Sequence, residues 1–188
     1  VYGLGVTREG LDGNPLMYEF VFERAWENSM PAHQWIANWA QCRGGNVDNH
    51  IVKAWKQLYE KIYTSAALCG QAVLMNARPQ LEGVEGWNTL PGYDYKNIDL
   101  WEIWKELLKA EGVYHSEYHF VINVGRQVLG NLFADYRDKF TDCYRKKKLE
   151  ETKVWGQRMD QLLLDVDRLL CCSPVFSIGK WIKDAKDF

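Results

Sequence analysis

The chain has 188 residues, of which 47% are hydrophobic, so it can bury a sizeable core and is not a disordered protein. Its formal net charge of −2 provides no global field for nucleic acid or an anionic membrane, and we expect neither as a partner. No apolar stretch reaches the roughly 20 residues that a membrane-spanning helix needs.

The first residues of the chain have the pattern of a short strand end, followed by a glycine-flanked loop. Helical signals begin at Pro15, which suits a first helical turn, with Asn14 as the expected cap. A second helix is expected after Pro31, and the glycine pair at 44–45 is expected to stop it.

Asp48 is expected to cap a third helix that continues to Ile62. Residues 76–96 then show no helical period and contain several prolines and glycines. Long irregular segments in compact domains are usually functional or disordered, and the aromatic residues of this one favour a function. Helical spacing resumes with Asp99 as the expected cap. The remaining predicted helices are Glu117–Lys148, Leu149–Leu170 and Ile178–Ala185.

Because no strand pattern follows the first few residues, the predicted fold class is all-α, with about six or seven helices packed on one another. We place a boundary after residue 14, with a strand-and-loop stub at 1–14 and an all-α domain at 15–188. Such a stub is typical of a domain boundary, so we expect the chain to begin inside a longer protein.

Aromatic residues make up 14% of the chain, including nine tryptophans, and are expected as core anchors or as platforms for a sugar ring. The five cysteines are odd in number and form no C-x-x-C pair, which favours free, buried thiols over disulfides or a zinc site. His115 and His119 lie four residues apart, but H-S-E-Y-H lacks the glutamate position of H-E-x-x-H. We therefore expect no metal site.

The loop G-V-T-R-E-G-L-D-G-N-P, residues 5–15, places glycines around Glu9, and three interpretations compete. A dinucleotide loop is disfavoured because Arg8 stands where the third glycine belongs. Glu9 and Asp12 could instead favour the positive end of the following helix. Glu9 could also be a catalytic carboxylate just past a strand end, where barrel enzymes carry their chemistry.

The longer segment G-L-G-V-T-R-E-G-L-D-G-N-P-L-M-Y-E-F, residues 3–20, resembles the end of the catalytic barrel of α-N-acetylglucosaminidases, glycoside hydrolase family 89. The resemblance extends to R-P-x-L at 78–81, to the pair Arg126-Gln127, and to F-x-x-G-x-W-I-x-x-A at 176–185. It covers nearly the whole chain. It implies that the N-terminal stub is the remnant of an upstream (β/α) barrel, which would be a partner within the same protein.

By this resemblance the protein is a retaining glycoside hydrolase with Glu9 as its nucleophile, acting on glycans with a terminal α-linked N-acetylglucosamine. The acid/base glutamate would lie upstream, so the 188 residues alone are expected to be inactive. No metal or organic cofactor is implied. The irregular segment supplies three aromatic candidates for contact with the sugar, Trp87, Tyr93 and Tyr95, each of which could equally anchor the segment on the helices.

The alternative is a non-catalytic all-α module for carbohydrate binding or protein interaction, in which Glu9 merely lies near a helix start. The oligomeric state is open. The family resemblance implies a secreted or periplasmic protein if the source is bacterial, and a lysosomal one if it is animal.

Overall fold

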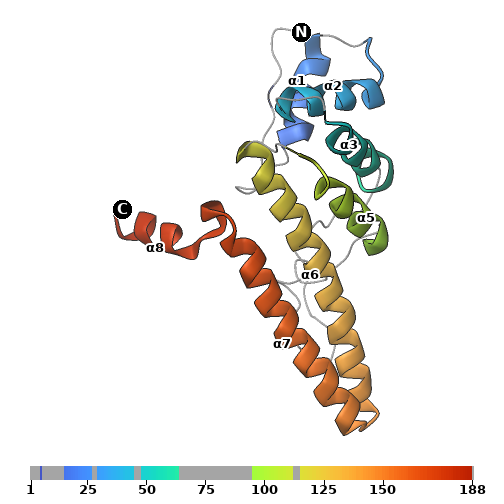
Figure 1. Ribbon diagram of the computed structural model, residues 1–188, viewed down its shortest axis with the longest axis vertical. Helices are drawn as coiled ribbons and strands as arrows, with labels where there is room; N and C mark the ends of the chain where they lie inside the picture. The colour runs from blue at the N-terminus through green and yellow to red at the C-terminus, as the bar shows by residue number, and fades with distance from the viewer. Residues whose placement is uncertain are drawn as a thin grey trace. The chain divides into compact units, whose positions relative to one another are not determined.

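The computed structural model describes residues 5, 15–26, 29–44, 48–63, 95–111 and 115–187. These residues contain α-helices and one 3₁₀ turn but no strand, which confirms the predicted all-α fold class for this part of the chain (Figure 1). In chain order the elements are α1 (Pro15–Trp26), α2 (Ala32–Gly44), α3 (Asn49–Lys61), α5 (Asn97–Leu107), α6 (His115–Arg145), α7 (Leu149–Cys171), η1 (Pro174–Phe176) and α8 (Ile178–Lys186).

The chain forms two compact units, Val1–Trp35 and Ile36–Phe188. In the first unit α1 begins at Pro15, as predicted. The ring of Phe20 on α1 meets Trp35 edge-on, with ring centroids 4.9 Å apart. This T-shaped contact places the positive edge of one ring against the negative face of the other and holds the helix within its unit.

Tryptophans anchor the core where α2, α3 and α6 meet in the second unit. Trp39 and Trp55 are 8% and 2% exposed, and their rings meet edge-on at 4.6 Å. Trp55 also stacks on Phe120 at 4.2 Å. The prediction that aromatic residues serve as core anchors is therefore confirmed for these two tryptophans, whereas Trp26 is 83% exposed.

The predicted cap of the helix after the irregular segment was wrong. α5 begins at Asn97 with Lys96 as its N-cap, so Asp99 lies in the first turn. There Asp99 accepts a hydrogen bond from Nζ of Lys61 on α3 at 2.7 Å. A carboxylate in the first turn favours the helix dipole without capping, and the sequence pattern did not separate the two positions.

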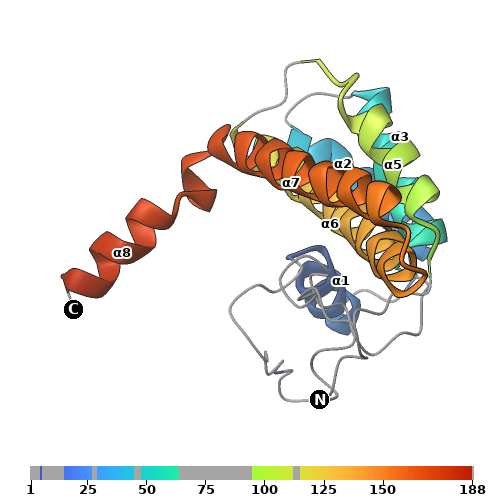
Figure 2. The same cartoon turned by 90° about the horizontal axis from the view of Figure 1, so that it is seen from below.

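α6 and α7 lie side by side as an antiparallel hairpin (Figures 1 and 2). In the connecting turn, Lys147 adopts a φ of 57°, the left-handed conformation that commonly ends a helix. The two helices bury a shared apolar cluster. Its members are Phe133, Ala134, Met159 and Leu162, with Leu129, Leu132, Tyr136 and Phe140 packed against them.

The described cysteines are all free, but only Cys143 is buried; Cys42, Cys171 and Cys172 are exposed. The prediction of buried thiols is thus correct for one of these four residues. Within the described part of the chain, no helix is both long and apolar enough to cross a bilayer.

Candidate functional site

Of the predicted site residues, Glu9, Trp87 and Tyr93 lie outside the described residues, and Tyr95 lies within them. Tyr95 is half-buried and comes two residues before the start of α5. The structure therefore places one of the candidate sugar contacts, and its surroundings are the starting point for the site.

The hydroxyl of Tyr95 is held by a buried amide network. Asn131 on α6 has no exposed surface, and its Nδ2 donates to the Tyr95 hydroxyl at 3.1 Å and to Oδ1 of Asn97 at 3.0 Å. The Oδ1 atom of Asn131 accepts from Nε2 of Gln127 at 2.9 Å. Asn97 in turn donates to the backbone carbonyl of Val128 at 3.2 Å. Both amide protons of the buried asparagine are thereby used, as burial requires.

Local sequence spacing explains this network. Gln127 and Asn131 are four residues apart and therefore lie on one face of α6. Tyr95 and Asn97 lie on either side of Lys96, the N-cap of α5, whose backbone is extended. Four side chains from two helical segments thus converge on one point, and they fix the start of α5 on α6.

Burial raises the pKa of the Tyr95 hydroxyl, and hydrogen bonds with Asn131 and Gln127 only partly offset this effect. The hydroxyl therefore stays protonated at neutral pH and acts as a neutral donor and acceptor. This chemistry suits positioning or sugar contact, and it excludes the hydroxyl as a general base.

The sequence analysis did not identify Asn131, and it named Gln127 only as part of the Arg-Gln pair in the family resemblance. The position of Asn131 in the helix could have indicated its role. Asn131 follows Val124 and Val128 by seven and three residues, so it is a polar residue on an apolar helical face. Such a residue needs partners when it is buried, which predicts a network rather than a surface position.

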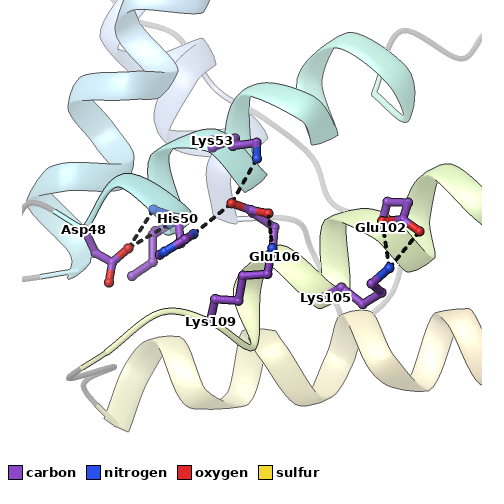
Figure 3. A network of polar contacts seen from close by, with 8 residues as sticks. Asp48, His50, Lys53, Glu102, Lys105, Glu106 and Lys109 are labelled. Carbon is purple, nitrogen blue, oxygen red and sulfur yellow. Dashed lines mark hydrogen bonds and ion pairs between the residues drawn. The ribbon is translucent and has the colours of Figure 1, made fainter.

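A second polar cluster surrounds Glu106 on α5, which is only 7% exposed (Figure 3). Its Oε1 atom lies 2.8 Å from Nδ1 of His50 and 3.1 Å from Nζ of Lys53, both on α3. Its Oε2 atom lies 3.1 Å from Nζ of Lys109. The hydrogen bond with His50, followed by that with Lys53, lowers the pKa of Glu106 to about 2. A carboxylate so firmly ionised clamps α3 to α5 and cannot serve as a general acid.

Asp48 caps α3, as predicted, and also binds the chain that follows α5. Its Oδ1 atom accepts from the amides of His50 at 2.7 Å and Ile51 at 3.3 Å, and its Oδ2 atom accepts from the amide of Glu111 at 3.0 Å. Desolvation acts to raise the pKa of Asp48, but these backbone donors outweigh it and the pKa is lowered. This carboxylate is therefore structural as well.

Two contacts fix the end of α7 to α6. Oγ of Ser173 lies 2.7 Å from Nδ1 of His119, and the guanidinium of Arg126 lies 5.8 Å from the ring centroid of Phe176. Ser173 resembles a nucleophile beside a base, but it is 1% exposed and already accepts from the amide of Val175. We assign it as the cap of η1.

The described residues contain no group of three or more histidine, cysteine, aspartate or glutamate side chains that could hold a metal ion. Their polar clusters instead join neighbouring helices, α3 to α5 through Glu106 and α5 to α6 through Asn131. Among the predicted site residues, Tyr95 is the one that the described part of the chain offers to a ligand, and its hydroxyl is held by a hydrogen bond from Asn131.

Comparisons with known proteins give the family context. The family model for the C-terminal domain of α-N-acetylglucosaminidase matches residues 35–188. Among solved structures, CpGH89 from Clostridium perfringens, in complex with its substrate GlcNAc-α-1,4-galactose, is similar with a TM-score of 0.79 and 21% sequence identity. The match covers 92% of this chain and 20% of that one, so the chain spans about a fifth of the solved relative. No curated protein matches.

Proposed function

Because the chain belongs to the family of α-N-acetylglucosaminidase C-terminal domains, we propose that it is the C-terminal part of a retaining, exo-acting α-N-acetylglucosaminidase. The observation that carries this proposal is the family match over residues 35–188. The similar helical fold of the Clostridium perfringens protein supports it. We place the end of a catalytic barrel at residues 1–14 and the helical domain at 15–188.

The proposed nucleophile is Glu9. A retaining glycosidase needs two carboxyl groups about 5–5.5 Å apart, one to attack the anomeric carbon and one to protonate the leaving oxygen. The solved relative carries two glutamate-to-glutamine substitutions and is bound to its substrate, which supports a mechanism with two glutamates. The second carboxylate would come from the upstream barrel, so we propose that the 188-residue chain alone is inactive.

The proposed substrate class is a glycan that ends in α-linked N-acetylglucosamine. The substrate of the solved relative, GlcNAc-α-1,4-galactose, belongs to this class. The helical domain would complete the pocket with aromatic side chains, for which we propose Trp87, Tyr93 and Tyr95. Sugar rings present C–H faces that pack on aromatic rings, while the hydroxyl of Tyr95 is held by Asn131.

From its family we also propose where the protein acts: it would be secreted or periplasmic if its source is bacterial, and lysosomal if its source is animal. The enzymatic step itself needs no cofactor in this scheme, since both catalytic groups are carboxyls.

The test is hydrolysis of an aryl α-N-acetylglucosaminide by the full-length parent protein. We expect activity in the parent and a loss on the order of 10³-fold or more in Glu9→Gln, because the amide cannot form the glycosyl-enzyme intermediate. The matched control is Glu150→Gln on α7, whose side chain is 85% exposed, and it should keep full activity. Circular dichroism should show both variants folded.

The stereochemistry of the product tests the retaining mechanism separately. Proton NMR recorded early in the reaction should show the α-anomer of N-acetylglucosamine first, before mutarotation. A β-anomer as first product would contradict a nucleophilic role for Glu9. Absence of hydrolysis in the parent, on this and on related α-glycosides, would favour the non-catalytic binding module.

A further inference from the structure

The hydroxyl oxygen of Tyr95 accepts hydrogen bonds from two amide side chains on one face of α6. Asn131 donates through its Nδ2 atom at 3.1 Å, and Gln127, one helical turn earlier, also bonds to the hydroxyl. Both bonds act to lower the pKa of Tyr95, as donors to a phenolic oxygen do. The direction of the hydroxyl is therefore set by two side chains rather than by one.

The two amides are themselves held in place by further hydrogen bonds. Oδ1 of Asn131 accepts from Nε2 of Gln127 at 2.9 Å, and Nδ2 of Asn131 also donates to Oδ1 of Asn97 at 3.0 Å. Asn97 donates to the backbone carbonyl of Val128 at 3.2 Å, which joins the network to the backbone of α6. Because each donor is fixed by another partner, a movement of the Tyr95 hydroxyl away from this position breaks both of its amide bonds.

Tyr95 is bound by a buried residue but is itself only half-buried. Asn131 has no exposed surface, whereas Tyr95 keeps part of its surface accessible. The hydroxyl is thus held from the buried side, and the remainder of the residue is not fully covered. An aromatic ring that is fixed at one end and accessible elsewhere is suited to packing against the C–H face of a sugar.

Helix packing alone does not require this polar network. A buried hydrogen bond gains little stability over an apolar contact of the same shape, so apolar residues could join the start of α5 to α6 equally well. The same two helices already meet in a close apolar contact, where Gly125 of α6 faces the indole of Trp104. A polar network adds one defined orientation of the side chain that it holds.

We propose that Asn131 and Gln127 are positioning residues for substrate binding, which orient the ring of Tyr95 against the sugar. This inference rests on the proposed function, which supplies Tyr95 as a sugar contact. Neither amide touches the sugar; both act through the hydroxyl of Tyr95. The two members of the Arg-Gln pair on α6 thereby have separate tasks, since Arg126 contacts the ring of Phe176.

Steady-state kinetics of the full-length parent on an aryl α-N-acetylglucosaminide test the proposal. Asn131→Leu and Gln127→Met each remove a donor to Tyr95 with little change in side-chain size. We expect each to raise KM about threefold to tenfold and to leave kcat within about twofold, because a weakened sugar contact reduces binding without changing the chemical step. Tyr95→Phe should show the same pattern, and combining it with Asn131→Leu should raise KM no further than either change alone.

Glu106→Gln is the control that separates positioning from stability. It weakens a different polar cluster, between α3 and α5, and should also destabilise the protein. Measured well below the unfolding temperatures, its KM should equal that of the parent. An equal rise of KM in Glu106→Gln, or an unchanged KM in both α6 variants, would overturn the proposal. Gln127 is only half-buried, so Gln127→Met keeps the test decisive if Asn131→Leu does not fold.

A spectroscopic measurement reads the same contact without catalysis. With 3-fluorotyrosine in place of Tyr95 in the full-length parent, addition of methyl α-N-acetylglucosaminide should shift the ¹⁹F resonance. Titration then gives a Kd, which we expect to rise about threefold to tenfold when Asn131→Leu is added to the labelled protein. The same titration with Glu106→Gln should leave the Kd unchanged.

The two measurements distinguish this inference from the proposed function. An active parent whose ¹⁹F resonance does not respond to the sugar would overturn the inference and leave the proposed function standing. A parent that hydrolyses no α-N-acetylglucosaminide, but whose sugar-dependent shift weakens in Asn131→Leu, would refute the proposed function and leave the positioning role standing. Absence of both hydrolysis and shift would overturn both.

Discussion

The amide nitrogen of Asn131 lies 3.1 Å from the hydroxyl oxygen of Tyr95, although the two residues are 36 positions apart in the chain. Asn131 is fully buried on α6, and Tyr95 lies two residues before the start of α5. This hydrogen bond therefore fixes a predicted sugar-contacting side chain to α6.

Tyr95→Phe should destabilise the protein by about 1–2 kcal/mol, because the substitution leaves one amide proton of buried Asn131 without its acceptor. Urea unfolding at neutral pH measures this change. Tyr144→Phe is the matched control, since Tyr144 is 48% exposed, and its effect should stay within about 0.5 kcal/mol. Equal effects at the two positions would contradict an anchoring role for the Tyr95 hydroxyl.

A double-mutant cycle should show that Tyr95 and Asn131 are energetically coupled. We expect Asn131→Leu combined with Tyr95→Phe to cost less than the sum of the single changes, by about 1 kcal/mol, because either change alone disrupts the same hydrogen bond. The comparison pair Asn131→Leu with Tyr144→Phe should be additive. Additivity in both pairs would mean that the bond contributes nothing measurable.

Glu106→Gln should destabilise the protein at pH 7 by about 1–2 kcal/mol, since a neutral amide replaces the buried carboxylate that His50, Lys53 and Lys109 contact and weakens these charge-assisted interactions. The folded pKa of Glu106 is lowered from 4.5 to about 2 by His50 first and by Lys53 and Lys109. Its ionised form thus stabilises the fold above the unfolded pKa, and this contribution is lost as pH falls from 4.5 towards 2.

Urea midpoints of parent and Glu106→Gln should therefore differ most at pH 5 and above, and should converge between pH 4.5 and 2. Glu150→Gln is the control for a solvent-exposed ion pair, and it should have little effect at any pH. A difference for Glu106→Gln that stayed constant down to pH 2 would show that charge is not the cause.

Gly125→Ala should destabilise the protein even though alanine is the better helix former. A Cβ atom at this position would lie 2.5 Å from Cζ2 of Trp104 on α5 and 2.9 Å from Cδ2 of Leu169 on α7. The gain in helix propensity, about 1 kcal/mol, is smaller than the overpacking penalty of about 1–3 kcal/mol for a rigid indole ring with little room to move.

The chain provides its own control for this prediction. At Gly156 on α7 the added Cβ would meet Phe140 at 3.5 Å, an ordinary van der Waals contact. Gly156→Ala should therefore be neutral or stabilising by up to about 1 kcal/mol. Thermal unfolding of the two variants side by side should show a lower unfolding temperature for Gly125→Ala and an unchanged or higher one for Gly156→Ala. Equal losses in both variants would contradict the packing argument.

The existence and type of the helices could be predicted because they depend on local periodicity. The long helix expected at Glu117–Lys148 is found at His115–Arg145, and the closing helix expected at Ile178–Ala185 is found at Ile178–Lys186. Apolar spacing of this kind reports which side of a helix will be buried. The Asp48 cap was also predictable, since its first two partners lie within three residues.

Residue chemistry and family motifs predicted only part of the candidate site. They led to Glu9, Trp87 and Tyr93, which lie outside the described residues, and to Tyr95. The partner of Tyr95 was missed, because a single asparagine in a long helix does not indicate which distant segment it will bind.

The sequence by itself determined the all-α character of the described residues, the helix faces and the family, since these follow from patterns within a few turns or from motifs along the chain. Only the tertiary structure decided which polar groups meet. Asp99 became a partner of Lys61 rather than a cap, and Asn131 became the support of Tyr95. These choices depend on which helices pack together, because a buried polar group must find its partner wherever packing brings one near.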